Sequence, residues 1–355
     1  SLRREWRLLR SRPRDWAMVS WVPLLAMALM CWIFSAGQPQ RLPIAVWNED
    51  GASPLSRQLV RMLEATPGFA RDVQRGAGAS VALLHNAQLA THSSLLQRDV
   101  RQVVGTLSAG VEMQALAKRG TPARALQLRV EPIRTQLVAL FNVSTNYEQF
   151  LATTLVPALV HILAMTAGAW SVGRELRDRT LGQWLHGAGG AAAVLAALLG
   201  KLLAPLALLW ASALACLLYL SQLRGWAVAG SLAWIALGLA LLVAVSLAAG
   251  AALAGLTLSL RTAMSGAGLL SAPAFAFSGV GFPLLAMSGS ARTWAEAMPY
   301  THYARLQIEQ WQMSAPPAQS LPVVAGLLLA TLALLALATV GLLRGLRRPE
   351  RWGAR

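Results

Sequence analysis

The chain has 355 residues, of which 55% are hydrophobic and only 13% are charged. A soluble globular protein carries about 25% charged residues, and apolar runs long enough to cross a bilayer recur here, which excludes an ordinary soluble protein. The net charge of +16 does not indicate nucleic-acid binding, because the basic residues flank apolar runs and form no groove-reading motif. Basic residues beside apolar runs are typical of the cytoplasmic side of membrane proteins.

The first 15 residues predict a short amphipathic helix in the cytoplasmic interface. Leu2, Trp6 and Leu9 recur at helical spacing, and arginines occupy the other faces. An unstructured basic anchor is the alternative. The first apolar run, residues 16–36, has no small-residue cleavage site after it and predicts a retained transmembrane helix.

The long segment 37–149 predicts an extracytoplasmic α/β domain. Alternating or β-branched runs indicate strands at 42–47, 80–84 and 125–130, and helical periodicity indicates helices at 54–63 and 89–118. Neither a glycine-rich phosphate loop nor a nucleophilic triad or metal-ligand spacing is found in this stretch. We expect the domain to contact a partner or handle substrate rather than perform chemistry.

Five further apolar runs bring the number of predicted transmembrane helices to six. They are residues 150–172, 198–220, 227–256, 263–287 and 321–343. Arginines in residues 1–15 and in the tail, 344–355, place both termini in the cytoplasm, which requires an even number of spans. The segments 37–149 and 288–320 then lie outside, and 173–190 lies inside.

The inner segment 173–190 predicts a short amphipathic cytoplasmic helix. Its apolar face would hold Leu176, Leu181, Trp184 and Leu185, and Glu175 and Arg179 would form an i,i+4 ion pair. One interpretation is a solvated loop between two spans. The other is a docking helix that inserts into a cleft on a motor protein.

Few groups inside the predicted spans can carry chemistry. Lys201 lies near the end of a span and is expected to extend its amine to the interface. His161, in the middle of another, is a candidate for a transport role or for a helix–helix hydrogen bond. We expect Cys31 and Cys216 to act as small packing residues, because neither has a His or Cys neighbour at metal-ligand spacing. Without a chain of acidic residues, proton or sodium coupling is not expected.

The chain also has no phosphate-binding P-loop. That motif needs Gly, four residues, then Gly-Lys-Ser/Thr, whereas Gly200-Lys201 is followed by Leu202. The chain is therefore not expected to bind ATP by that device.

The order of several motifs resembles the ABC-2-type transporter permeases, in the branch with a long extracytoplasmic insert. The motifs are NAQ at 86–88, FNVSTNYEQFL at 141–151, RELRDRTLGQWL at 174–185, LGKLLAP at 199–205, APAFAFSGVGFPLLAM at 272–287 and MPYTHYARLQIEQW at 298–311. The chain departs from the family at 67–69, where Gly68 leads directly to Phe69 and an additional strand and helix are missing.

The resemblance implies the membrane subunit of an exporter, a polytopic α-helical protein with six transmembrane helices, similar to type V ABC exporters, and an α/β extracytoplasmic domain. Two permeases, identical or closely homologous, would pair and bind two cytoplasmic ATPase subunits. The chain itself would hold no cofactor, since ATP and Mg²⁺ belong to the ATPase. The cargo would be amphiphilic or hydrophobic and would move outward by alternating access.

The resemblance also implies two groups of functional residues. The ATPase-coupling group is Arg174, Glu175, Arg179, Leu181, Trp184 and Leu185. The gate or translocation path is His161, Pro273, Phe277, Ser278, Gly279, Phe282 and Pro283. The prolines and glycines after residue 272 favour a broken helix, although they are also compatible with simple packing. Residues 298–311 would cap the exit.

Other functions are less consistent with the sequence. A membrane-anchored scaffold or sensor with a partner-binding outer domain needs fewer spans, and a membrane-embedded enzyme needs clustered polar residues. We expect a multi-pass protein of a bacterial inner membrane, with membrane lipid and an outer adaptor as further candidate partners and without nucleic acid.

Overall fold

The computed structural model describes residues 2–35, 146, 148–187, 189–282 and 284–352, with isolated positions between Arg98 and Gly110. The chain divides into two units, Ser1–Gln38 with Ala139–Arg355 and Pro39–Val138. The predicted strands, the motif at 86–88 and the junction at 67–69 lie outside the described residues. The described positions of the predicted helix 89–118 are helical.

Every regular element among the described residues of the first unit is a helix. In chain order the α-helices are α1 (Leu2–Ser11), α2 (Pro13–Val19), α3 (Trp21–Phe34), α8 (Thr153–Arg177), α9 (Leu181–Trp184), α10 (Ala191–Leu218), α11 (Leu232–Thr257), α12 (Leu260–Ser271), α13 (Ala274–Phe277), α14 (Gly289–Ala297), α15 (Pro299–Trp311) and α16 (Pro317–Leu346). Single π-helical turns extend α8 at Glu148–Ala152 and α10 at Tyr219–Leu223.

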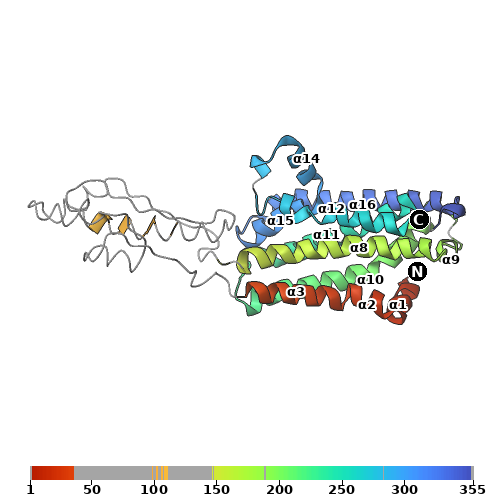
Figure 1. Cartoon of the computed structure of the whole chain (residues 1–355), viewed down its shortest axis with the longest axis horizontal. Coiled ribbons are helices and arrows are strands. Elements are labelled where there is room, and N and C mark those ends of the chain that lie inside the picture. Colours follow the sequence, from red (N-terminus) through yellow and green to blue (C-terminus); the bar gives the residue numbers. More distant parts are fainter. Residues whose placement is uncertain are drawn as a thin grey trace, which may run out of the picture. The chain divides into compact units, whose positions relative to one another are not determined.

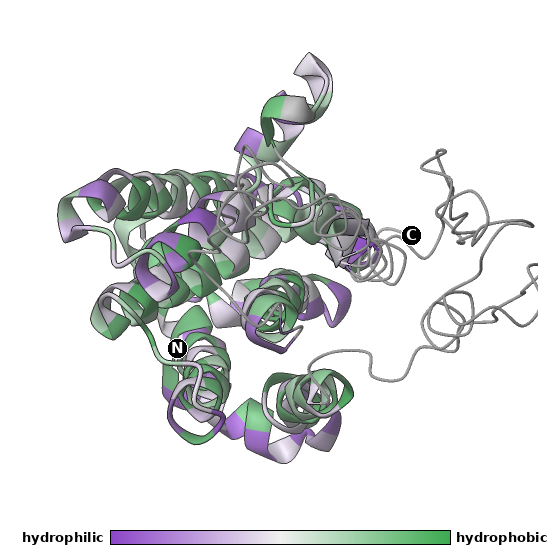
Figure 2. Ribbon diagram, turned by 90° about the vertical axis from the view of Figure 1, so that its left-hand side faces the viewer, coloured by the Kyte–Doolittle hydropathy of each residue, from purple (hydrophilic) through white to green (hydrophobic). Residues whose placement is uncertain are grey.

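Five stretches of the described residues are long and apolar enough to cross a membrane. They are Pro13–Phe34, Glu148–Arg177, Ala191–Leu223, Leu232–Thr257 and Pro317–Leu346. The helices lie side by side along the long axis of the bundle (Figure 1), and most of the described ribbon is hydrophobic (Figure 2). The protein is therefore a multi-pass helical membrane protein.

Both termini and α9 lie at one end of the bundle, which we call the terminal end, whereas α15 lies toward the other end (Figure 1). The predicted helix in the first 15 residues is present as α1 and the start of α2, which excludes the unstructured anchor. In α1 the side chains of Glu5 and Leu9 are buried, so the helix packs against the bundle.

The predicted fifth span, residues 263–287, is not one continuous helix in the structure. α12 ends at Ser271, a turn at Ala272 and Pro273 follows, and α13 has only four residues. Proline lacks the amide that an uninterrupted helix requires at this point. The break agrees with the expectation of a broken helix in this segment. The chain from α12 to α15 returns from the terminal end to the start of α16 (Figure 1).

The centre of the bundle depends on close contact between α8 and α11. A Cβ atom on Gly168 would overlap the carbonyl oxygen of Leu247, and one on Gly250 would overlap the carbonyl oxygen of Met165. Lipid offers no hydrophobic gain for bringing two apolar helices together, so packing through small residues supplies much of the stabilisation. These two glycines allow the backbones of α8 and α11 to touch.

We expect Gly250→Ala to lower the free energy of unfolding by about 1–3 kcal/mol, because the added methyl group overpacks this contact. Gly268→Ala in α12 is the matched control, since a Cβ atom at Gly268 would have no heavy atom within 4 Å. Alanine favours a helix over glycine by ~1 kcal/mol there. Thermal unfolding of both variants in one detergent measures the difference, and equal midpoints would contradict the close packing.

Candidate coupling site at the terminal end

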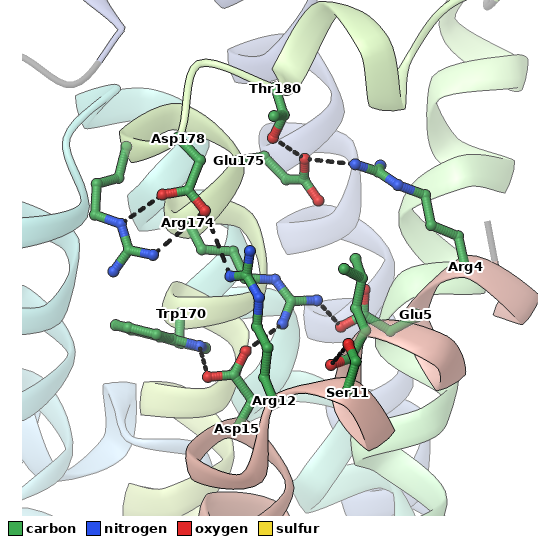
Figure 3. A network of polar contacts seen from close by, with 12 residues as sticks. Arg4, Glu5, Ser11, Arg12, Asp15, Trp170, Arg174, Glu175, Asp178 and Thr180 are labelled. Carbon is green, nitrogen blue, oxygen red and sulfur yellow. Dashed lines mark hydrogen bonds and ion pairs between the residues drawn. The ribbon is translucent and has the colours of Figure 1, made fainter.

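The last turn of α8 carries charged side chains into the interior of the bundle. Arg174 and Glu175 are each only 2% exposed, although Arg and Glu are almost never fully buried unless they are paired. Their partners come from α1 and α2 (Figure 3) and from α10. We call these residues, Glu5, Asp15, Arg174, Glu175 and Lys201, the buried charge network.

Arg174 holds the N-terminal helices against α8. Its guanidinium contacts the carboxylate of Glu5 in α1 and donates a hydrogen bond of 2.8 Å to Oδ2 of Asp15 in α2. The indole Nε1 of Trp170, one turn earlier in α8, donates to Oδ1 of the same Asp15 at 3.2 Å (Figure 3). The carboxylates of Glu5 and Asp15 therefore both face inward.

Lys201 joins α10 to the same network. Its Nζ donates to Oε1 of Glu175 at 2.7 Å and to Oε2 of Glu5 at 3.0 Å, and it lies 4.6 Å from the ring centroid of Trp184. Glu175 also accepts hydrogen bonds from Nη2 of Arg4, at 3.1 Å, and from the hydroxyl of Thr180 (Figure 3). The sequence predicted that Lys201 extends its amine to the interface. The structure contradicts this, because Lys201 is only 1% exposed.

The network positions the predicted coupling segment differently from the sequence prediction. The expected helix over 173–190 is not a separate element, since α8 continues to Arg177 and the next helix, α9, has four residues. Leu181, Trp184 and Leu185 are buried in the bundle. A Cβ on Gly182 would lie 3.3 Å from the ring of Trp352, so the C-terminal segment packs here as well.

The predicted ion pair between Glu175 and Arg179 was wrong. Arg179 lies beyond the end of α8 with a left-handed φ of 54°, and Glu175 pairs with Arg4 and Lys201 instead. Among the predicted coupling residues, Arg179 alone is exposed.

The exposed surface of this segment is polar and partly basic. It is formed by Arg177, Asp178, Arg179, Gln183 and His186, which we call the exposed coupling surface. The hydrogen bond from Arg177 lowers the pKa of the Asp178 carboxyl below its ordinary value, and Arg12 acts in the same direction. Asp178 is therefore an anion at neutral pH.

Sequence reasoning missed Glu5 and Asp15 and misjudged Lys201. A usable signal was present, since Glu5 and Asp15 are the only acidic residues among the first 15, and Lys201 is embedded in an apolar run. An acidic residue among arginines and a lysine inside an apolar run are candidates for pairing with each other. Spacing along the chain could not show it, because 196 residues separate Lys201 from Glu5.

The structure places the predicted gate residues in two groups. His161 is fully buried, and its Nδ1 lies 2.7 Å from the hydroxyl of Ser246 in α11. This is the helix–helix hydrogen bond that the sequence left as an alternative. The His161 ring also stacks on the ring of Tyr300 in α15, with 6.4 Å between the ring centroids. The ring of Phe275 in α13 lies at the same centroid distance from Tyr300, 6.4 Å.

The other gate residues follow the break after α12. Pro273 precedes α13 and Phe277 is its last residue, while Ser278 is buried and Phe282 is 51% exposed. Gly279 has φ of 86°, a conformation that favours glycine. Pro283 lies outside the described residues. Residues 298–311, expected to cap the exit, form α15, whose Tyr300, Tyr303 and Gln307 are buried against the bundle.

The opposite end of the bundle has a smaller polar contact. Glu148, at the start of the α8 span, is 1% exposed and binds the Arg224 guanidinium through both oxygens, each at 2.8 Å. Trp226 donates to the same carboxylate at 3.0 Å, and Arg224 donates to the Ser35 carbonyl at 3.0 Å. The carboxylate raises the pKa of Arg224. This contact joins the ends of α3, α8 and α10.

The chemistry of the described residues is that of packing and ion pairing. Within these ranges, no group of three or more His, Cys, Asp and Glu side chains could hold a metal ion. The polar networks connect helices to one another. They are suited to transmitting movement between helices.

These features define a polytopic helical membrane protein with an internal charge network at its terminal end. Residues 66–340 match the family described as ABC-2 family transporter protein, and because this is most of the chain, the protein belongs to that family. The family consists of ABC transporter permeases, membrane subunits that carry no nucleotide-binding domain and pair with ATPase subunits. No curated protein and no solved structure matches the chain.

We expect Lys201→Met to lower the free energy of unfolding by about 3–5 kcal/mol, because Glu5 and Glu175 lose a buried cation. Arg305→Met is the control, since Arg305 is 73% exposed in its pair with Glu309, and such pairs contribute about 0.2–1 kcal/mol. Chemical unfolding in detergent gives both values.

A double-mutant cycle tests whether the loss comes from the pairing. Glu5→Gln combined with Lys201→Met removes one of the unpaired carboxylates and should cost less than the two single changes added together. Additive losses would show that Lys201 and Glu5 do not interact.

Proposed function

We propose that this permease exports an amphiphilic or hydrophobic substrate by alternating access, driven by a separate cytoplasmic ATPase. Membership of the ABC-2 family is the observation that carries the proposal. The apolar, charge-poor bundle supports it, since such a path passes greasy cargo more readily than ions. Family membership also disfavours the alternative of a membrane-anchored scaffold or sensor.

The orientation follows from charge. Arginines flank the span at both termini, and the bundle places both termini at one end (Figure 1). The positive-inside rule puts this end in the cytoplasm, which in a bacterium makes the protein a component of the inner membrane. We further propose that two copies, or one copy and a close homologue, form the transport path, and that an adaptor can continue it outward.

In this proposal the ATPase contacts the exposed coupling surface. Leu181, Trp184 and Leu185 are buried, so they act by holding α9 in place. Arg174 and Glu175 act from behind the surface, because the buried charge network ties the end of α8 to α1, α2 and α10. A push on residues 177–187 would therefore move several helices together.

We expect Arg179→Glu to weaken association with the ATPase about tenfold, which corresponds to ~1.4 kcal/mol. The side chain is exposed, so the permease should still fold. Arg305→Glu, in α15 toward the opposite end, reverses another exposed charge and should leave association unchanged. Binding of the ATPase encoded beside the permease to immobilised permease measures both. Equal binding by the two variants would rule out this docking surface.

The gate is proposed at the irregular segment after α13. A side chain at Gly279 would be strained by φ of 86° and its Cβ would lie 3.0 Å from Cγ of Leu284. Gly279→Val should therefore reduce export several-fold while assembly with the ATPase persists. Gly281→Val is the control, since nothing lies within 4 Å of its Cβ position. Substrate flux in proteoliposomes gives the comparison, and normal flux with Gly279→Val would exclude the gate.

A further inference from the structure

The two cysteines of the chain meet between α3 and α10. The Sγ atoms of Cys31 and Cys216 are 3.5 Å apart, although 185 residues separate them in sequence. Both are free thiols. Formation of a disulfide would need an approach of about 1.5 Å, since the bonded distance is ~2.05 Å. Small side-chain rotations on two adjacent helices can supply such a movement.

The thiols are reachable from outside the bundle. They line an open groove of about 400 Å³ between α3 and α10, together with Leu24, Trp32, Ser212 and Tyr219. Cys31 is 7% exposed, and Cys216 is more exposed. A small reagent that enters the groove can reach both thiols.

The position along the helices favours oxidation. Cys31 lies about one turn from Ser35, whose carbonyl accepts a hydrogen bond from Arg224 at the end away from the termini. With the termini in the cytoplasm, an orientation that rests on the proposed function, this end faces the oxidising side, where disulfides form and persist.

A bond between the two cysteines would restrain α3 strongly, because few residues of this helix pack against the bundle. Only Pro23, Met27 and Cys31 of α3 are buried, a single stripe at i,i+4 spacing. The large side chains of Trp21, Leu25 and Trp32 are 63%, 68% and 73% exposed. A covalent bond at Cys31 would fix the outer half of a helix that is otherwise attached along a narrow line.

We propose that Cys31 and Cys216 form a reversible disulfide that fastens α3 to α10 and fixes the width of the groove between them. The oxidant is the disulfide form of a small thiol or of a thiol oxidoreductase. The thiolate of one cysteine attacks one sulfur of that disulfide, forms a mixed disulfide and releases one thiol. The thiolate of the other cysteine then attacks the sulfur of the first cysteine and releases the second thiol. Two protons leave the protein thiols, and the oxidant takes up the two electrons.

The experiment uses the intact chain, whose only thiols are these two. Purified permease is incubated with oxidised glutathione, denatured and labelled with a polyethylene-glycol maleimide, which adds a visible mass to every free thiol. The reduced protein should take up two labels and the oxidised protein none, without a dimer band. Two labels after oxidation, or a bond only between two chains, would overturn the proposal.

A matched variant controls for simple proximity of thiols in the membrane. Cys216→Ser with Ala215→Cys keeps two cysteines but moves one by a residue around α10, and Ala215 also lines the groove. It should retain both labels under the same oxidation. If it crosslinks as readily as the natural protein, the geometry of the pair is not what selects the bond.

Thermal unfolding tests the fastening itself. Oxidation should raise the unfolding midpoint of the natural protein by several degrees, because the bond closes a very long loop and restrains α3. Cys216→Ser should show no such shift. A disulfide that forms without any change in the midpoint would contradict the role assigned to it.

Discussion

The cost of burying charge in an apolar bundle governs the terminal end of this protein. Glu5, Glu175 and Lys201 are each nearly inaccessible, and an unpaired ion in such a place costs several kcal/mol. Each therefore needs its partner, and the partners belong to different helices. This requirement, rather than helix propensity, determines where α1 and α2 lie against α8 and α10.

The network changes how the N-terminal segment is understood. Its arginines are typical of a basic membrane anchor, and Arg3, Arg7 and Arg10 are indeed exposed. The two acidic residues instead turn inward and bind Arg174. The segment is thus an integral part of the bundle, and movement of α8 at this end must be felt by α1 and α2.

Between the two polar ends, the bundle is held by backbone packing and by hydrogen bonds between uncharged groups. The centre has close backbone packing at Gly168 and Gly250 and a single hydrogen bond between His161 and Ser246. Phe275 and Tyr300 link this centre to the broken segment after α12. The described part of this ABC-2 permease thus has ion pairs toward both ends and a packed apolar middle.

The sequence by itself determined the class of protein and most of its spans, because hydrophobic length and arginine position depend only on local composition. It also located the interrupted segment, since Pro273 and Gly279 act on the backbone where they stand. It could not determine the partners of Glu175, the inward side of α9 or the meeting of Cys31 with Cys216. Those depend on which helices become neighbours, and only the tertiary structure decides contacts between residues that lie far apart along the chain.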